Sequence, residues 1–233
     1  MLKIGVLGAG HLGKIHIRLL KELSEVFELV GFVDQSDENA QKVMDDYAIP
    51  RFNSIQELIE KVDCIDVVTP TLAHFDCAVQ ALRNSRHVFI EKPVTETVEE
   101  SRQLIRLARE ANVKVQVGHV ERFNPAFQAA VPFLTKPMFI ETHRLAQFNP
   151  RGTDVSVVLE LGNGRPAKKI LFDKPELPEI NAIKEELHAF ALSIINDEVP
   201  PVPLEAGAMA LEVAHQIIEK ININSPLISD NNI

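Results

Sequence analysis

The chain has 233 residues, 45% of them hydrophobic, which is enough apolar material for one large domain or two modest ones. Its 33 acidic residues outnumber 24 lysines and arginines, and the net charge of -9 argues against a nucleic-acid or anionic-membrane surface, which needs a basic face. No apolar run is as long as a membrane span, and the glycine-broken N-terminus differs from a signal peptide, so we expect a globular cytoplasmic protein.

The first half of the chain alternates short apolar runs with longer amphipathic ones. The short runs are rich in valine and isoleucine and lack a period of two, which is typical of strands buried on both faces. We predict strands at 3–8, 27–34, 64–70, 87–91 and 113–119, with helices between them at 11–23, 37–48, 72–84 and 97–112. This order predicts an α/β fold, in which helices cover both faces of a doubly wound parallel sheet.

After about Gly118 the rhythm changes, and we predict a domain boundary between residues 118 and 122. The elements predicted beyond it are a helix at 124–135, extended strands at 138–148 and 154–161, and amphipathic helices at 179–196 and 205–221.

The stretch "VLGAGHLGKIH" contains Gly8, Gly10 and Gly13 in the pattern G-x-G-x-x-G, between a predicted strand and a predicted helix. In such a turn the first glycine permits the tight bend, the second lets a pyrophosphate approach the backbone, and the third lets helix and strand pack closely. The helix N-terminus then offers free N–H groups to the phosphates. We therefore expect a dinucleotide here, with His11 and Leu12 of the same turn among its contacts.

Asp34 ends the second predicted strand, about 20 residues after the glycines, where an acidic residue is expected. A carboxylate at this place accepts hydrogen bonds from a ribose 2′-OH and repels a 2′-phosphate. No arginine follows Asp34 immediately, so NAD is the expected cofactor and NADP is disfavoured.

Two further strands end in polar residues, at "VVTPT" and at "FIEKP". Ligands of an open α/β sheet sit outside the carboxyl ends of the strands, so Thr69 and Pro70 should edge the cofactor cleft. Glu91 and Lys92 should face the nicotinamide and its substrate. A lysine in a partly dry cleft can exchange protons with a hydroxyl group, but a solvated lysine at a strand end explains the same residues equally well.

The stretches "VLGAGHLGKIH", "VVTPTLAH", "IEKP" and "GHVERFNPA", in this order, resemble the Gfo/Idh/MocA family of NAD(P)-dependent oxidoreductases. The resemblance covers about the first 155 residues and the last two predicted helices. It implies a Rossmann domain, residues 1–120, followed by an α+β substrate and oligomerisation domain, residues 121–233. An open, mostly antiparallel sheet in the second domain would cover the nicotinamide and form homodimers or homotetramers.

The resemblance also implies roles for single residues. Lys92 would be the catalytic residue and would contact both the cofactor and the substrate hydroxyl. Glu91 and Pro93 would shape the cleft, with a cis peptide bond before Pro93. His74 matches the histidine that the family places near the cofactor.

"GHVERFNPA" resembles the branch of the family that acts on nucleotide-linked amino sugars, including UDP-N-acetylglucosamine 3-dehydrogenases. His119, Arg122 and Asn124 are then candidates for the substrate or nicotinamide pocket, where an arginine suits a diphosphate. In the alternative interpretation, Arg122 pairs with a nearby acid such as Glu121 or Glu141.

The family also carries an aspartate followed four residues later by a histidine, which acts as the acid/base partner of the lysine. No D-x-x-x-H occurs in this chain, and the family's longer members differ from it near residues 160–161. Either a segment is missing from the sequence there, or the protein is a shortened relative that binds NAD without chemistry. We favour a missing segment, because an open sheet stripped of strands would expose a wide apolar surface.

The other histidines do not replace the absent one. His143, His188 and His215 are expected to be packed or exposed side chains, and no cluster of histidine, cysteine and acid shows metal-ligand spacing. Cys64 and Cys77 lie in segments typical of regular structure and are expected to be buried, reduced thiols.

Taken together, these patterns predict an NAD-dependent oxidoreductase that transfers hydride between nicotinamide and a secondary alcohol of a sugar. A UDP-linked N-acetylhexosamine is the expected substrate. The alternatives are a dehydrogenase of an inositol or free aldose, and a non-catalytic dinucleotide-binding sensor or scaffold.

Overall fold

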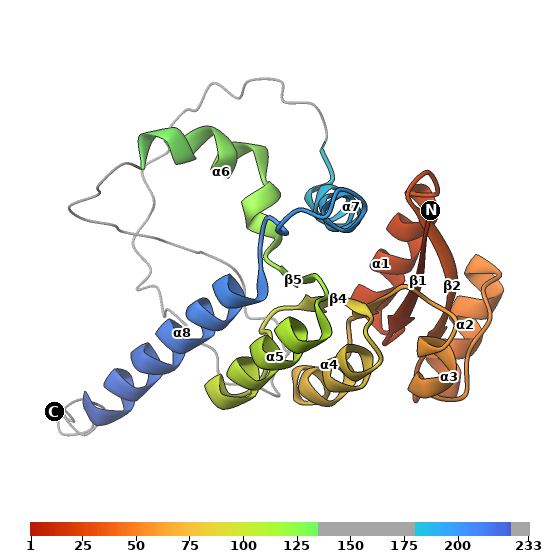
Figure 1. The fold of residues 1–233 in the computed structure, drawn as a ribbon, viewed down its shortest axis with the longest axis horizontal. Coiled ribbons are helices and arrows are strands. Elements are labelled where there is room, and N and C mark those ends of the chain that lie inside the picture. The colour runs from red at the N-terminus through yellow and green to blue at the C-terminus, as the bar shows by residue number, and fades with distance from the viewer. Residues whose placement is uncertain (135–179, 225–233) are drawn as a thin grey trace, which may run out of the picture.

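The computed structural model describes residues 1–134 and 180–224, with side chains through Ile221 (Figure 1). The strands predicted at 138–148 and 154–161, the expected break near residues 160–161 and the expected antiparallel sheet lie outside the described residues, as do Glu141 and His143.

A parallel sheet of five strands forms the centre of the molecule: β1 (Leu2–Leu7), β2 (Phe27–Val33), β3 (Cys64–Val67), β4 (His87–Glu91) and β5 (Val115–Gly118). Their order is β2-β1-β3-β4-β5, and every neighbouring pair is parallel. A single parallel bridge between Phe32 and Arg51 adds one more position outside β2. The chain runs outward from β1 in one direction and from β3 in the other, so the switch point lies between these two strands. This confirms the predicted doubly wound α/β sheet.

Helices connect the strands and follow the sheet: α1 (His11–Glu22), α2 (Asp37–Tyr47), α3 (Ile55–Ile59), α4 (His74–Arg83), α5 (Val98–Ala111), α6 (Pro125–Ala130), α7 (Ala182–Ile195) and α8 (Leu204–Asn224). Short 3-10 turns are η1 (Thr71–Ala73), η2 (Val120–Phe123) and η3 (Val131–Phe133). Local chemistry fixes several starts. Thr97 and Glu100, for example, form a reciprocal capping box at α5.

Two helical predictions need correction. The short helix α3 was missed, although Ser54 accepts a hydrogen bond from the Glu57 backbone and so marks its start. The helix predicted at 124–135 ends at Ala130, and η3 follows it. Pro132 has no N–H to continue the helical hydrogen bonds, which explains the change to a 3-10 turn.

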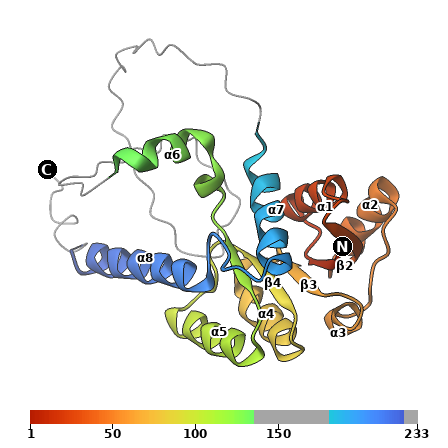
Figure 2. The ribbon, with the colours of Figure 1, turned by 45° about the horizontal axis from the view of Figure 1, so that its top comes forward.

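Helices cover both faces of the sheet, and each face has its own apolar core. One core joins the sheet to α1, α2 and α7, and the other joins it to α3, α4, α5 and α8. Figure 2 shows α7 beside α1 and α8 beside α5. The two helices that are last in the sequence therefore pack on opposite faces of the N-terminal sheet.

Close contacts anchor these late helices. Phe190 of α7 is fully buried and meets Phe89 of β4 edge-on, with ring centroids 5.8 Å apart. On the other face, a side chain at Gly207 of α8 would lie 2.6 Å from Val117 of β5, so the glycine permits the close approach. None of the helices described is long and apolar enough to cross a membrane. The domain boundary near residue 120 stays a prediction.

Candidate cofactor and active site

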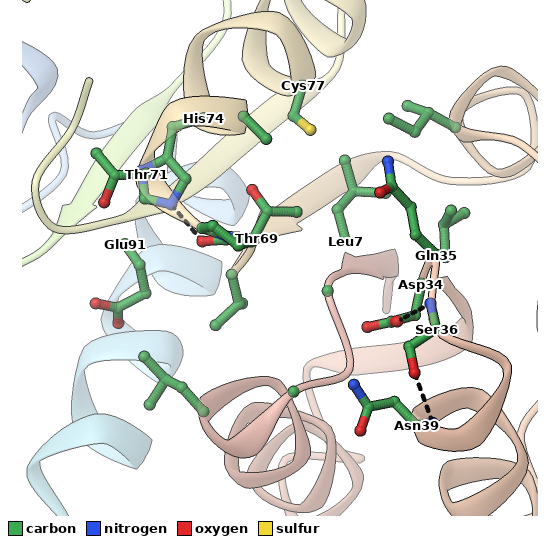
Figure 3. A pocket seen from close by; sticks show the side chains of 18 of the residues that line it. Leu7, Asp34, Gln35, Ser36, Asn39, Thr69, Thr71, His74, Cys77 and Glu91 are labelled. Atoms are coloured by element: carbon green, nitrogen blue, oxygen red, sulfur yellow. Dashed lines mark hydrogen bonds between the residues drawn. The ribbon is translucent and has the colours of Figure 1, made fainter. Parts of the chain in front are cut away.

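A cavity of about 1020 Å³ lies at the carboxyl ends of the strands, at the switch point of the sheet (Figure 3). Its lining includes all but one of the residues predicted to bind the cofactor: Gly8, Gly10, His11, Leu12, Asp34, Thr69, Pro70, His74, Glu91 and Lys92. The exception is Gly13, which is buried in the first turn of α1, against the backbone of Gly8. Residues from four strand ends therefore meet at one hollow, as the sequence predicted.

The three glycines of the first turn serve different purposes. Gly8 has a φ of +97°, and a side chain there would lie 2.7 Å from the carbonyl oxygen of Val68. A side chain at Gly13 would collide with the carbonyl oxygen of Gly8. A side chain at Gly10 would meet no atom within 4 Å, so the protein itself does not require a glycine there. The open space at Gly10 would let a pyrophosphate pass close to the backbone.

The start of α1 supports the same ligand. Gly10 is the N-cap residue of the helix, no side chain caps it, and its first turn holds no acidic residue. The free N–H groups and the positive end of the helix dipole therefore point at the cavity without a competing carboxylate.

The Asp34 carboxylate is fixed at the end of β2. Its two oxygens accept the backbone N–H groups of Ala9, at 2.5 Å, and Ser36, at 2.7 Å. Each carboxylate oxygen keeps a further lone pair for the hydroxyls of a ribose. Arg51 donates to the Asp34 backbone oxygen at 2.8 Å and to the Asp37 carboxylate at 2.6 Å, and it does not line the cavity. The Arg51 guanidinium is thus paired with protein groups and does not face the cavity, which agrees with the expected preference for NAD, whose ribose carries no 2′-phosphate.

Five polar side chains on the Asp34 side of the cavity were not predicted: Gln35, Ser36, Asn39, Asn53 and Ser54. The first three follow β2 and belong to the start of α2, where Ser36 accepts from the backbone N–H of Asn39 at 3.2 Å. The other two precede α3, the helix that the sequence analysis missed. The capping pattern of Ser54 would have revealed that helix, but only the tertiary structure brings it to the cavity.

Lys92 follows β4 and is exposed at the cavity wall. It also lines a second hollow of about 420 Å³, between the segment after β4 and α8, together with His119. The peptide bond between Lys92 and Pro93 is cis, as the family resemblance implied. Lys92 therefore lies between two hollows, one of them the cavity at the strand ends.

His74 is 1% exposed and holds two strand ends together. Its Nδ1 lies 2.8 Å from the carbonyl oxygen of Pro93, and its Nε2 lies 2.8 Å from that of Thr69 (Figure 3). A neutral imidazole has one N–H and can donate to one of these carbonyls at a time. His74 therefore lines the cavity and, through these contacts, also helps to position the Lys92–Pro93 turn.

Of the three residues predicted for the substrate, the structure brings only His119 to Lys92. Burial, and then the positive charges of Arg122 and Lys92, lower the pKa of His119 below its ordinary value of 6.5, so its imidazole is neutral at neutral pH. Asn124 caps α6 through the Ala126 backbone and donates to the Glu121 carboxylate at 2.9 Å. Arg122 is exposed, and neither it nor Asn124 lines the two hollows.

Both cysteines are free and buried, as predicted. Burial raises the pKa of each thiol, and this holds for Cys77 although it reaches the cavity wall. In the part of the chain that the structure describes, no group of histidines, cysteines and acids could hold a metal ion.

The family model for the oxidoreductase family with an NAD-binding Rossmann fold, Gfo/Idh/MocA, matches residues 2–119. The chain belongs to this family. The match spans the whole sheet and ends at His119, so the five-stranded sheet is the NAD-binding Rossmann fold of this family.

Curated relatives are similar over parts of their length. UDP-N-acetylglucosamine 3-dehydrogenase of Acidithiobacillus ferrooxidans is 35% identical over 161 residues, which are 69% of this chain and 50% of the relative. The scyllo-inositol 2-dehydrogenase (NAD(+)) of Bacillus subtilis is 33% identical over 131 residues, 55% of this chain and 38% of that protein. The chain thus spans half the length of these relatives or less.

Solved structures show the same fold. UDP-N-acetylglucosamine 3-dehydrogenase GnnA from Acidithiobacillus ferrooxidans has a TM-score of 0.79 at 23% identity, covering 93% of this chain and 96% of that one. GenD2 from gentamicin A biosynthesis, in complex with NAD, has a TM-score of 0.54 at 25% identity, covering 57% of this chain and 38% of that one.

Proposed function

We propose that this protein is an NAD-dependent oxidoreductase that transfers hydride between nicotinamide and a secondary alcohol of a sugar. The observation that carries the proposal is the position of Lys92, which lines both the dinucleotide cavity and the adjoining hollow. A substrate hydroxyl in the second hollow would be within reach of the same side chain that borders the cofactor.

Bound NAD supplies the hydride acceptor at C4 of its nicotinamide ring. The work of the chain is to bind, orient and exchange protons. The start of α1 and Asp34 would hold the two ends of the adenosine diphosphate part, while the Lys92 side chain would hydrogen-bond the alcohol oxygen and relay the leaving proton to solvent. Neutral His119, beside Lys92, would accept a hydrogen bond from the sugar.

A UDP-linked N-acetylhexosamine is the proposed substrate class. It is supported by the motif "GHVERFNPA" and by the similarity to UDP-N-acetylglucosamine 3-dehydrogenase over 161 residues. Arg122 and Asn124 are proposed to approach the nucleotide diphosphate from η2 and the start of α6. On the family resemblance we also propose the open antiparallel sheet over the nicotinamide, a domain boundary near residue 120, and a homodimer or homotetramer.

An inositol is the second candidate substrate, because an NAD-dependent scyllo-inositol 2-dehydrogenase is 33% identical over 131 residues. The two candidates differ in one requirement, since only the first needs a nucleotide on the sugar.

The test is to incubate purified protein with NAD and each of UDP-N-acetylglucosamine, UDP-N-acetylgalactosamine, free N-acetylglucosamine and scyllo-inositol, and to follow NADH fluorescence. NADH formed only from UDP-sugars supports the proposal. NADH formed from scyllo-inositol alone supports the second candidate. A protein that binds NADH and oxidises none of a broad panel would be a dinucleotide-binding sensor or scaffold, as the missing D-x-x-x-H motif would suggest.

A further inference from the structure

A cluster of ionisable side chains lies buried behind the cavity wall. His16 of α1 is 0% exposed, its Nδ1 lies 2.9 Å from Asp66 Oδ2 of β3, and its Nε2 lies 3.4 Å from Glu91 Oε1 of β4. Asp66 is also fully buried. Burial opposes a charge on His16, but the two carboxylates outweigh it and raise the pKa of His16 to about 10. An imidazolium ion is therefore held between two carboxylates.

Glu186 of α7 adds a third acid to this cluster. It is 0% exposed, and neither of its carboxyl oxygens has a hydrogen-bond partner among the described residues. Burial first, and then the negative charge of Glu91, raise the pKa of Glu186 from its ordinary value of 4.5 to about 8. The nearby His119 backbone and the charge of His16 act in the opposite direction. At neutral pH Glu186 is thus mostly a neutral carboxylic acid.

Glu91 connects the cluster to the cleft. Its side chain is 10% exposed and lines the dinucleotide cavity, while Oε2 accepts the backbone N–H of Lys92 at 3.1 Å. A side chain at Gly118 of the neighbouring strand β5 would lie 2.7 Å from Glu91 Oε1. The glycine therefore leaves room for the Glu91 carboxylate in this position. The Glu91 carboxylate therefore contacts His16 on its buried side and the backbone of Lys92 on the cavity side.

We propose that Glu186 is a positioning residue for the cofactor cleft. As a neutral acid it lets the Glu91 carboxylate stay against His16 and hold the Lys92 turn. Once Glu186 loses its proton, the three carboxylates of Asp66, Glu91 and Glu186 share a site with one imidazolium, and repulsion drives Glu91 toward the open cavity, where the cofactor binds. The proposal takes the cleft as the dinucleotide site of the proposed function.

The groups that face Glu186 come from four elements: His16 of α1, Asp66 of β3, Glu91 of β4 and Gln116 of β5, whose side chain donates to the Glu186 backbone oxygen at 2.8 Å. The other ionisable side chains of α1 and η2, the elements packed against α7, are exposed or partly exposed. These are His11, Lys14, Arg18, Lys21 and Glu22 of α1, with Glu22 paired to Lys184 of α7 at 3.2 Å, and Glu121 and Arg122 of η2.

Two groups at the walls of the hollows have pKa values away from 8. The pKa of His119 is below 6.5, and that of the Cys77 thiol is above 9.0. His16 keeps its proton to about pH 10. Burial also raises the pKa of Asp66, so a change in cofactor binding centred near pH 8 is assigned to Glu186 when Glu186→Gln removes it.

The experiment measures the Kd of NADH by fluorescence between about pH 6.5 and about 9, for wild type and for Glu186→Gln. The glutamine imitates the neutral acid at every pH. Glu185→Gln, at the exposed neighbouring position, is the matched control. If only the neutral form binds well, about a tenth of the protein is competent one pH unit above the pKa, and the wild-type Kd rises roughly tenfold toward pH 9.

We expect Glu186→Gln to keep its low-pH affinity throughout this range, and Glu185→Gln to follow wild type. A wild-type Kd that is constant from about pH 6.5 to about 9 overturns the proposal. This measurement uses the wild-type protein alone and so does not depend on the folding of a variant. A Glu186→Gln profile that rises as the wild-type profile does overturns it as well. Either result leaves the proposed function intact, whereas a wild type that binds no NADH at any pH overturns both.

Discussion

The three glycines of the first turn allow folding to be separated from cofactor binding. We predict that Gly10→Ala weakens NADH binding without destabilising the protein, whereas Gly13→Ala destabilises the protein itself. The reason is geometric. A side chain at Gly10 would meet no protein atom within 4 Å, whereas one at Gly13 would collide with the carbonyl oxygen of Gly8, which is part of the backbone and not the end of a flexible side chain.

The expected magnitudes follow from these surroundings. Gly10 has a φ of −67°, outside the left-handed region that favours glycine, and a ψ of −160°, at the edge of the extended region open to alanine. The substitution restricts the unfolded chain and should change stability by about 0.4–1 kcal/mol in the favourable direction. In Gly13→Ala, overpacking against backbone should cost about 2 kcal/mol, which lowers the Tm of a domain of this size by roughly 4–8 °C.

The assay pairs thermal unfolding with an NADH fluorescence titration for wild type and both variants. In Gly10→Ala, the Kd of NADH should rise at least about tenfold, equivalent to about 1.4 kcal/mol, because the new methyl group occupies the approach of the pyrophosphate. The reasoning is refuted if Gly10→Ala binds NADH like wild type, or if Gly13→Ala unfolds at the wild-type temperature.

Three further predictions follow from the site and the core. Lys92→Ala should lower turnover of the sugar substrate by about 10²–10⁴-fold, while the Kd of NADH changes only a few-fold. Lys61→Ala, at an exposed position, is the control. A large loss of NADH binding in Lys92→Ala would instead show that Lys92 mainly holds the cofactor. Asp34→Ala should raise the Kd of NADH and reduce the difference in affinity between NADH and NADPH, as measured by titrating both cofactors. An unchanged ratio of the two Kd values would contradict the proposed contact of Asp34 with the ribose. Phe190→Ala should lower the free energy of unfolding by about 3–5 kcal/mol in denaturant titrations, whereas Ile195→Ala, at a side chain that is 52% exposed, should cost far less; equal effects would refute the packing of α7 on the sheet.

The position of α7 has a consequence for how the protein folds. Phe190 and Glu186 lie about a hundred residues after the strands that they contact, and both are fully buried there. Contacts between segments so far apart form only after a long loop has closed. The contacts of Glu186 behind the cavity wall thus form only once α7 has packed on the sheet.

The sequence by itself determined the parts of this protein that depend on neighbouring residues. Valine-rich runs and amphipathic stretches predicted every strand of the sheet and most helices, because burial on both faces imposes its own pattern on a strand. The turn at Gly8 could be identified for the same reason, whereas the Glu91–Lys92–Pro93 segment was singled out by the family resemblance. A strained φ, a helix start and a strand end are local properties, and the parallel order of the strands then brings their carboxyl ends together.

Only the tertiary structure decided which distant residues share a site. No local pattern shows that α7 packs beside α1, and so the sequence analysis missed the cluster of His16, Asp66 and Glu186. The same holds for His74, which was expected to contact the cofactor and also links the carbonyl groups of Thr69 and Pro93. A pKa, a buried charge and a hydrogen bond across the sheet depend on what surrounds a side chain in space, and that is set by packing between elements far apart in the chain.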